Sequence, residues 1–248
     1  MLNMKNYLKR ISASHYTTCS LQNLEELQSL HMQHIPFENL DVIRKVPIYL
    51  NLDTIYDKLV SRNRGGYCYE LNGLFHWLLT ELGYEASLVS ATVRRMNGVW
   101  AKKDTHAAII VQLDKPYLVD VGFGDSTILP IPLSGLERTD VSGAYKIEKQ
   151  ENDFYDLIQK RNDVERILYR FTTQPKKLID FHEGCVFNQV AKESSFTHTD
   201  IITVATPLGR KTISDAQFII TENGVQQKKD LSSDEKDQIL RSTFGIQI

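Results

Sequence analysis

The sequence predicts an α+β protein, because helix-type and strand-type patterns occupy different parts of its 248 residues. Before Gly83, apolar residues recur at spacings of three and four, as they do along one face of a helix. Beyond Gly83 the pattern changes to short runs rich in β-branched residues, which are typical of strands. The last part mixes strand-like runs with a final helix.

Each element has its own signal. Ser20 and Asn51 are expected N-caps of two helices, and a third helix is expected to open near Cys68 and to stop at Gly83. Ser232 and the glutamate three residues later form a capping box for the last helix. Strands are expected at residues 86–93, 106–113, 117–121, 145–149, 167–171, 201–205 and 218–221, with a helix over about 177–192 and a turn at Asn223-Gly224.

Composition excludes several classes of protein. The chain has 29 Lys+Arg and 31 Asp+Glu, a net charge of −2, whereas a dedicated nucleic-acid binder needs a basic surface. No apolar run approaches the roughly 18 residues of a membrane span. The N-terminus lacks the pattern of a secretory signal, so a cytoplasmic protein is expected. The three cysteines form no CxxC pair, which argues against a disulfide framework and a structural zinc site.

Cys68 has the most unusual setting in the chain. It directly follows Arg64-Gly65-Gly66-Tyr67, whose two glycines permit a close backbone approach, and it stands at the expected start of a helix. Free amide groups and the dipole at a helix N-terminus stabilise a thiolate and can hold an oxyanion. Cys68 is therefore a candidate nucleophile. The alternative is a small buried apolar side chain, as most free cysteines are.

A nucleophilic cysteine needs a base and a group that orients the base. His106 opens an apolar strand, and Asp120 lies in the next expected strand, where a carboxylate calls for a partner. A turn centred on Leu113 would place the two residues opposite each other. A turn centred on Lys115 would put Asp120 opposite Ile110, about 13 Å along the strand from His106. The pair is therefore expected to need the earlier turn or a bulge, and the alternative is that Asp120 caps the following turn.

Three other motifs are too incomplete to predict a site. His31 and His34 lie one helical turn apart without a further ligand at metal spacing, so no metal site is expected. Gly122-Phe123-Gly124 lacks the third glycine of a dinucleotide-binding loop, and Leu208-Gly209-Arg210-Lys211-Thr212 lacks the upstream glycine of a phosphate-binding loop.

Four ordered motifs together resemble the arylamine N-acetyltransferase family. They are Ile35-Pro36-Phe37-Glu38-Asn39-Leu40, Arg64-Gly65-Gly66-Tyr67-Cys68-Tyr69-Glu70-Leu71-Asn72, the strand that starts at His106, and Val119-Asp120-Val121-Gly122-Phe123-Gly124. Weaker similarity extends to both ends of the chain. The resemblance implies a cysteine-protease-like triad of Cys68, His106 and Asp120.

The resemblance also implies a fold of three parts. These are an N-terminal helical bundle at residues 1–83 that carries the nucleophile, a central β-barrel-like domain at residues 84–192 that carries the histidine and aspartate, and a C-terminal α/β lid at residues 193–248. Because the chain ends at Ile248, earlier than in many family members, a shortened or rearranged lid is expected.

Further roles come from the same resemblance. Glu38 and Arg64 would form a structural pair that braces the cysteine loop, and Asn39 and Asn72 would support the site. The residues expected to line a pocket for flat aromatic amines, with core packing as the alternative, are Phe37, Tyr67, Tyr69 and Phe123. The candidate partners for coenzyme A phosphates are Arg94, Arg95 and Lys103.

The implied activity is a ping-pong transfer of acetyl from acetyl-CoA, through acetyl-Cys68, to arylamines, arylhydrazines or arylhydroxylamines. No metal, nucleic acid or membrane partner is expected. The same three side chains also fit a cysteine hydrolase or transglutaminase-like acyltransferase, which would open an amide instead of a thioester. A non-catalytic binding module, the third possibility, predicts an unreactive Cys68.

Overall fold

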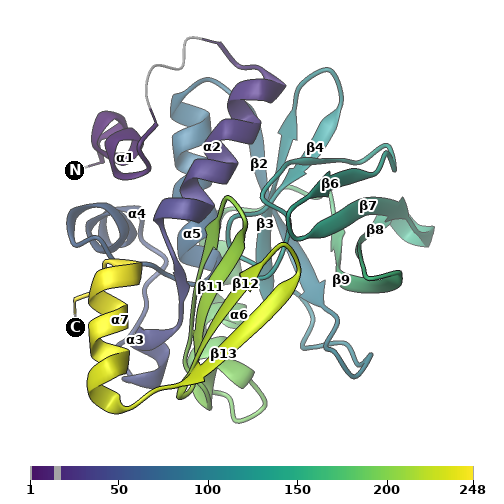
Figure 1. Cartoon of the computed structure of the whole chain (residues 1–248). Helices are drawn as coiled ribbons and strands as arrows, with labels where there is room; N and C mark the ends of the chain where they lie inside the picture. Colours follow the sequence, from purple (N-terminus) through teal and green to yellow (C-terminus); the bar gives the residue numbers. More distant parts are fainter. Residues whose placement is uncertain (1, 14–17, 248) are drawn as a thin grey trace.

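The computed structural model describes residues 2–13 and 18–247 and confirms the α+β class (Figure 1). Its α-helices are α1 (Met4–Arg10), α2 (Leu21–His34), α3 (Leu40–Ile43), α4 (Leu52–Tyr56), α5 (Cys68–Glu81), α6 (His182–Val190) and α7 (Ser233–Phe244). A π-helical turn, Asp57–Ser61, continues α4. Helices α1, α2, α4 and α5 lie together on one side of the molecule, and α5 packs against strands β2 and β3.

The helix signals of the sequence are confirmed at most ends. The Ser20 hydroxyl accepts the Asn23 N–H at 3.2 Å to cap α2, and Asn51 caps α4 in the same way. Gly83, with a φ of +93°, follows the end of α5 in a conformation that suits glycine. The helix expected over residues 177–192 is shorter, since a 3₁₀ turn, Leu178–Phe181, precedes α6.

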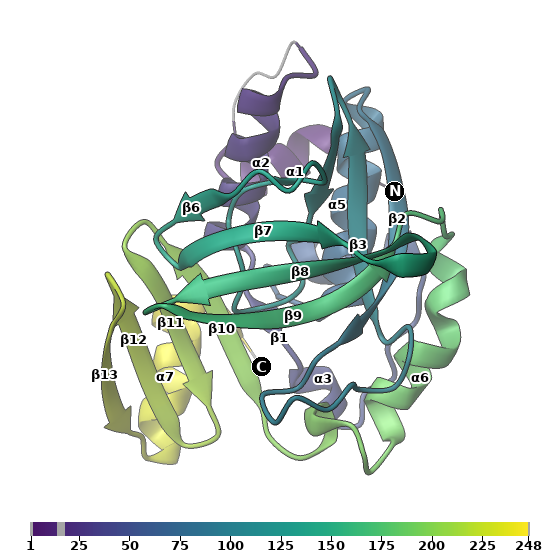
Figure 2. The ribbon, with the colours of Figure 1, turned by 90° about the vertical axis from the view of Figure 1, so that its right-hand side faces the viewer.

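An eight-stranded antiparallel sheet forms the centre of the molecule (Figure 2). Its strands, in spatial order, are β5 (Ile131–Pro132), β4 (Pro116–Val119), β3 (His106–Gln112), β2 (Glu85–Val93), β9 (Val164–Thr172), β8 (Phe154–Arg161), β7 (Gly143–Lys149) and β6 (Arg138–Asp140). The sheet curls until β5 contacts β7, which makes it a nearly closed barrel. The sequence pattern does not reveal β8, the strand between the two expected strands at 145–149 and 167–171.

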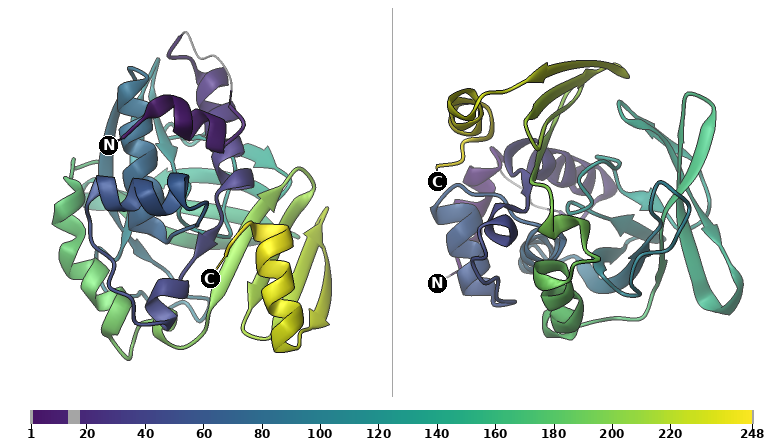
Figure 3. Two further views of the ribbon diagram at one scale, coloured as in Figure 1. Left: turned by 90° about the vertical axis from the view of Figure 1, so that its left-hand side faces the viewer. Right: turned by 90° about the horizontal axis from the view of Figure 1, so that it is seen from below.

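A second sheet lies beside the helices and faces the barrel (Figure 3). Its strands, in spatial order, are β1 (Phe37–Glu38), β10 (Ile201–Thr206), β11 (Gly209–Ser214), β12 (Gln217–Glu222) and β13 (Val225–Asp230). One face packs against α7, where Ile213 meets Leu240 and Phe244. The expected Asn223-Gly224 turn joins β12 to β13, and the Ser232 capping box opens α7.

The second sheet joins the first third of the chain to the last, because β1 pairs with β10. The segment at 208–212, rejected above as a phosphate-binding loop, is a turn followed by strand β11. None of the helices formed by residues 2–13 and 18–247 is long and apolar enough to cross a membrane.

Candidate active site

Cys68 is the first residue of α5 and is 3% exposed. The preceding loop runs close to the helix because Gly66 has no side chain: a Cβ there would stand 2.8 Å from Glu70 Oε2. The same oxygen accepts a hydrogen bond from the Tyr67 N–H at 3.1 Å. The helix start is thus held in place, with its unpaired amide groups and its positive dipole end at the sulfur.

His106 and Asp120 meet across β3 and β4 without direct pairing. The β3–β4 turn is centred on Asp114, so Asp120, one residue beyond β4, lies across from Ala108. Diagonal neighbours on one face of a sheet are close enough for long side chains to touch. His106 Nε2 lies 2.7 Å from Asp120 Oδ2. The expectation that this pair needs an earlier turn or a bulge is wrong, because the diagonal contact suffices.

The Asp120 carboxylate accepts hydrogen bonds on both oxygens. Oδ1 accepts from the Asn72 amide at 2.9 Å and from the Gly122 N–H at 2.8 Å, and Oδ2 accepts from the Tyr169 hydroxyl at 2.9 Å. Burial raises the pKa of Asp120, but His106, Asn72 and Gly122 together hold it below its ordinary value. Both interpretations of Asp120 therefore describe its contacts, since it pairs with the histidine and also caps the following turn.

The ring of His106 is buried between two partners. Burial lowers the pKa of this ring, but the Asp120 carboxylate and then the Cys68 side chain raise it to about 10. Because Nε2 faces Asp120, Nδ1 is the nitrogen left for the sulfur. An imidazolium that bridges a carboxylate and a cysteine is an arrangement that supports a nucleophilic sulfur.

Sequence reasoning missed two residues of this site. Tyr169 lies on β9, which β3 and β2 separate from β4 in the barrel sheet, and no local motif predicts its contact with Asp120. Gly122 packs against the cysteine: a Cβ there would lie 2.7 Å from the Cys68 Cα. The Gly-x-Gly pattern at 122–124 was the available signal, but it indicates close packing rather than a dinucleotide loop.

A buried group of charged side chains, the brace cluster, lies beside the loop of residues 64–67 that precedes Cys68. Its members are Glu38, Asp41, Lys58, Arg64 and Glu70. Arg64 Nη2 lies 2.7 Å from Glu38 and 3.0 Å from Asp41, and Lys58 Nζ lies 2.7 Å from Asp41 and 2.9 Å from Glu70. The structure thus pairs Glu38 with Arg64, and Lys58 adds a second cation that the sequence analysis did not name.

The two asparagines implied as supports both bridge segments. The Asn72 amide donates to the Ala107 carbonyl at 2.7 Å, and its oxygen accepts the Val121 N–H at 3.0 Å, so it joins α5 to the chain on both sides of the triad. Asn39 donates to the Phe196 carbonyl at 3.0 Å and accepts the Ile201 N–H at 2.7 Å, which fixes the segment that leads into β10.

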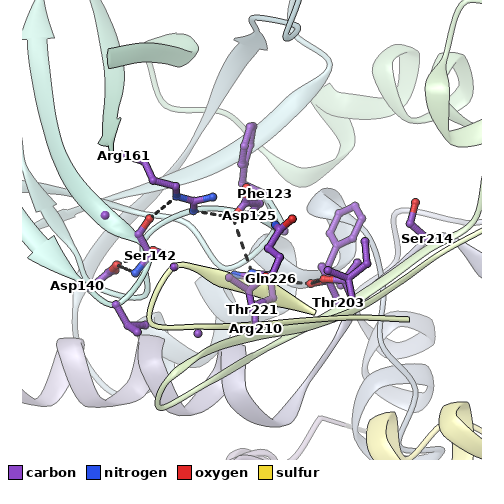
Figure 4. A pocket seen from close by; sticks show the side chains of 18 of the residues that line it. Phe123, Asp125, Asp140, Ser142, Arg161, Thr203, Arg210, Ser214, Thr221 and Gln226 are labelled. Atoms are coloured by element: carbon purple, nitrogen blue, oxygen red, sulfur yellow. Dashed lines mark hydrogen bonds and ion pairs between the residues drawn. The ribbon is translucent and has the colours of Figure 1, made fainter. Parts of the chain in front are cut away.

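A cavity of about 960 Å³ opens between the barrel and the C-terminal sheet (Figure 4). Phe37, Phe123 and Phe196 supply aromatic wall. The Phe123 ring also packs edge-on against the His106 ring, with 5.5 Å between their centroids. The cavity therefore adjoins the triad through Phe123.

The structure places only two of the four expected pocket residues on this wall. Phe37 and Phe123 line the cavity, whereas Tyr67 and Tyr69 are fully buried in the core. The Tyr67 hydroxyl lies 2.7 Å from the sulfur of Cys185, and the Tyr69 hydroxyl accepts a hydrogen bond from Asn188 at 3.4 Å. Their hydroxyls are used to attach α6, so the alternative of core packing holds for both tyrosines.

The three cations proposed for phosphate contacts also lie away from this cavity wall. Arg94 stacks on Trp100, and Arg95 donates to the Glu193 carbonyl at 3.0 Å. Lys103 lines a separate surface hollow near the end of β2. Among residues 2–13 and 18–247, no three His, Cys, Asp or Glu side chains are arranged to hold a metal ion.

A cysteine at a helix start, a histidine and an aspartate on neighbouring strands, and an adjoining cavity define a cysteine-dependent acyl-transfer enzyme. Comparison with known proteins makes this specific. The family model described as N-acetyltransferase matches residues 20–248. The chain belongs to the arylamine N-acetyltransferase family.

Relatives match over the whole chain. The arylamine N-acetyltransferase of Mycolicibacterium smegmatis is 31% identical, with 100% of this chain and 93% of that protein covered. The Mycobacterium marinum enzyme in complex with CoA has a TM-score of 0.91 and 31% identity over 98% of this chain and 93% of its own. The (BACCR)NAT3 enzyme from Bacillus cereus, with a Cys-His-Glu triad, has a TM-score of 0.93 and 26% identity over 100% of both chains. In this chain the acidic side chain that contacts the histidine is Asp120, which is one methylene group shorter than glutamate.

Proposed function

We propose that this chain acetylates aromatic amines, hydrazines or hydroxylamines with acetyl-CoA, through an acetyl-cysteine at Cys68. The observation that carries the proposal is the buried His106 ring, whose Nε2 lies 2.7 Å from Asp120 Oδ2 and whose pKa is raised by Asp120 and by Cys68 at the start of α5. Membership of the family supplies the acyl donor and the class of acceptor.

In the first half-reaction the Cys68 thiolate attacks the thioester carbonyl of acetyl-CoA, while His106 is protonated. The carbonyl oxygen becomes an oxyanion, which the unpaired N–H groups at the start of α5 stabilise. The bond from carbon to the coenzyme A sulfur then breaks, and His106 gives its proton to the leaving thiolate. Asp120 holds the ring in place throughout, and the acetyl group remains on Cys68.

In the second half-reaction the acceptor nitrogen attacks the acetyl carbon. The neutral His106 ring takes a proton from that nitrogen, the carbon–sulfur bond breaks, and Cys68 returns as a thiolate beside an imidazolium. Phe37 and Phe123 contact the flat acceptor ring. Weakly basic aromatic amines suit this step because they are largely neutral at pH 7.

The supporting residues act by keeping the nucleophile in place. Arg64 and Glu38 hold the loop before Cys68, Asn72 fixes Asp120 relative to α5, and Asn39 anchors the segment beside the cavity. Such a preorganised site spends no binding energy on ordering its own groups.

The test is the intact mass of the protein after brief incubation with acetyl-CoA in the absence of amine. One acetyl increment is expected on the wild type and on Cys19→Ala, which removes an exposed cysteine, and none is expected on Cys68→Ala. Addition of an arylamine should remove the increment and yield the acetylated amine.

Two outcomes would contradict the proposal. If no increment forms while Cys68 is still alkylated by a haloacetamide, the acyl donor is not acetyl-CoA. A hydrolase or transglutaminase-like activity then becomes the favoured interpretation. If Cys68 is alkylated more slowly than a free thiol, the chain is a binding module.

A further inference from the structure

A second charged group, the cavity cluster, lies where the barrel faces the C-terminal sheet. It consists of Asp125 with Arg161 from β8, Arg166 from β9 and Arg210 from β11. Arg161 Nη2 and Arg166 Nη2 lie 3.1 Å and 3.3 Å from the carboxylate oxygens, and Arg210 Nε lies 4.0 Å away. Three cations therefore share this one carboxylate, and the nearest further carboxylate on the cavity wall is that of Asp140, which also attracts Arg210.

Arg210 carries the least compensated charge of the cluster. Its side chain is only 11% exposed, and its one hydrogen bond among the described residues goes to the hydroxyl of Thr203, at 3.1 Å. Burial lowers the pKa of this guanidinium despite the attraction of Asp125. A buried cation whose nearest carboxylate oxygen is 4.0 Å away is only partly compensated, so an anion in direct contact with it would be stabilised.

Arg161 and Arg210 both line the 960 Å³ cavity, and Figure 4 shows them reaching Asp125 from the barrel and from the C-terminal sheet. Arg166 is not part of that wall. Alternation along the strands turns hydroxyl groups toward the same space, with Thr203 on β10, Thr212 on β11 and Thr221 on β12. Guanidinium groups among hydroxyls make a wall suited to phosphate oxygens.

We propose that Arg161 and Arg210 bind the phosphate groups in the nucleotide part of the acyl donor. The cations that the sequence analysis offered for this role lie elsewhere, whereas these two line the cavity that adjoins His106. The phosphates would add negative charge in contact with the two arginines, beyond that of Asp125 and Asp140. This inference rests on the proposed function, because it takes acetyl-CoA as the donor.

The test compares acetyl-CoA with S-acetylpantetheine, which carries the same thioester but no phosphate. Arg161→Gln and Arg210→Gln should each lower kcat/KM for acetyl-CoA about tenfold or more, the usual effect of one lost charged hydrogen bond. With S-acetylpantetheine as the donor, the decrease in kcat/KM caused by either arginine variant should be no larger than the decrease caused by Lys211→Gln. This control removes one positive charge from the neighbouring position on β11, which lies off the cavity wall.

A binding measurement separates this proposal from the proposed function. Coenzyme A, titrated into the wild type and the two arginine variants by calorimetry, should bind about tenfold more weakly to the variants. If binding of coenzyme A depends on the arginines but no amine is acetylated, the result supports the phosphate site and contradicts the proposed function. If Cys68 is acetylated normally and the arginine substitutions change neither coenzyme A binding nor kcat/KM, the result contradicts the phosphate site and supports the proposed function.

Three results would overturn the proposal. Equal losses with both thioesters would give the arginines a structural role only, and Arg161→Gln, which is partly exposed, decides this if Arg210→Gln does not fold. A loss seen with 4-aminobenzoate but not with aniline as acceptor would assign the cations to an acceptor carboxylate. Binding of inorganic phosphate as tight as that of coenzyme A would make the cluster a general anion site.

Discussion

The brace cluster and the cavity cluster use the same kinds of side chain with opposite charge balance. Beside the cysteine loop, three carboxylates surround two cations, a sum of −1, and all five side chains are largely buried. At the cavity, three arginines share one carboxylate, a sum of +2 for these four side chains, and Arg161 and Arg210 adjoin open space. Buried charges that are nearly balanced by close partners stabilise the fold, whereas an excess of positive charge next to a cavity indicates a binding site for an anionic ligand.

The triad follows the pattern of the brace cluster. Its carboxylate is fully hydrogen-bonded, and its imidazole lies 2.7 Å from that carboxylate, with Cys68 as a second group that raises its pKa. Loss of a partner in this matched region should therefore have large effects, while changes at the cavity cluster should affect ligand handling more than folding.

The largest effect is expected from Asp120→Asn. An amide cannot stabilise a charged His106 ring, so formation of acetyl-Cys68 should slow on the order of 10³- to 10⁴-fold while the fold persists. Quenched-flow mass spectrometry measures this rate, and circular dichroism checks the fold. A near-normal rate would remove Asp120 from the mechanism.

Lys58→Gln should break the matched brace cluster. It leaves Glu38, Asp41 and Glu70 with Arg64 alone, and removal of one partner of a buried ion pair costs about 3–5 kcal/mol in the free energy of unfolding. Urea denaturation gives this value.

The matched control for this variant is Lys146→Gln, a substitution of the same type in a more exposed pair with Glu148 and Glu165. Little change is expected there. Similar values for the two lysines would show that the brace cluster does not support the fold.

Tyr169→Phe removes one of the hydrogen bonds to Asp120 without removing the ring. A lost hydrogen bond to a charged group corresponds to a rate about tenfold lower. The control is Tyr155→Phe, whose ring stacks on Phe171 in the same sheet. If the two variants have equal acetylation rates, the Tyr169 hydroxyl has no role in positioning the carboxylate.

The two buried histidines sharpen the comparison. Asp120 and Cys68 overcome burial to raise the pKa of His106 to about 10, whereas burial, with the charges of Arg10 and His34, lowers that of His31 to about 3. In an NMR titration at pH 6 to 8, His106 should be charged and His31 neutral.

The two shifts act on stability with opposite signs. His106 contributes stability that is complete below about pH 6.5 and is lost as pH rises toward 10, because the folded state binds the proton more tightly. His31 favours the neutral ring, so its contribution is lost as pH falls below 6.5 toward 3. A neutral His106 at pH 7 would contradict the assignment of the ion pair.

The smallest effect is expected at the cavity cluster. Arg161→Gln should change the free energy of unfolding by less than about 1 kcal/mol, since the side chain is 35% exposed and two other arginines remain beside Asp125. Urea denaturation under the conditions used for Lys58→Gln measures it. A loss as large as that of Lys58→Gln would assign the cavity cluster to folding rather than to a ligand.

Local signals in the sequence were enough for several parts of this protein. Helix ends at Ser20, Asn51 and Ser232 depend on a side chain and an amide three residues away, so they can be predicted without the fold. Cys68 stands out for the same reason, because its two preceding glycines and the helix start are its immediate neighbours. The family motifs then led to His106 and Asp120.

Only the tertiary structure decided which side chains meet across strands and between the two sheets. Asp120 reaches His106 because the turn is centred on Asp114, a shift of one residue that the hydrophobic pattern does not fix. Tyr169 and Arg210 come from β9 and β11, and Tyr67 and Tyr69 turn into the core instead of the cavity. Long-range contacts depend on register and sheet curvature, which sum small preferences over many residues, whereas caps and helix starts depend on a few neighbours.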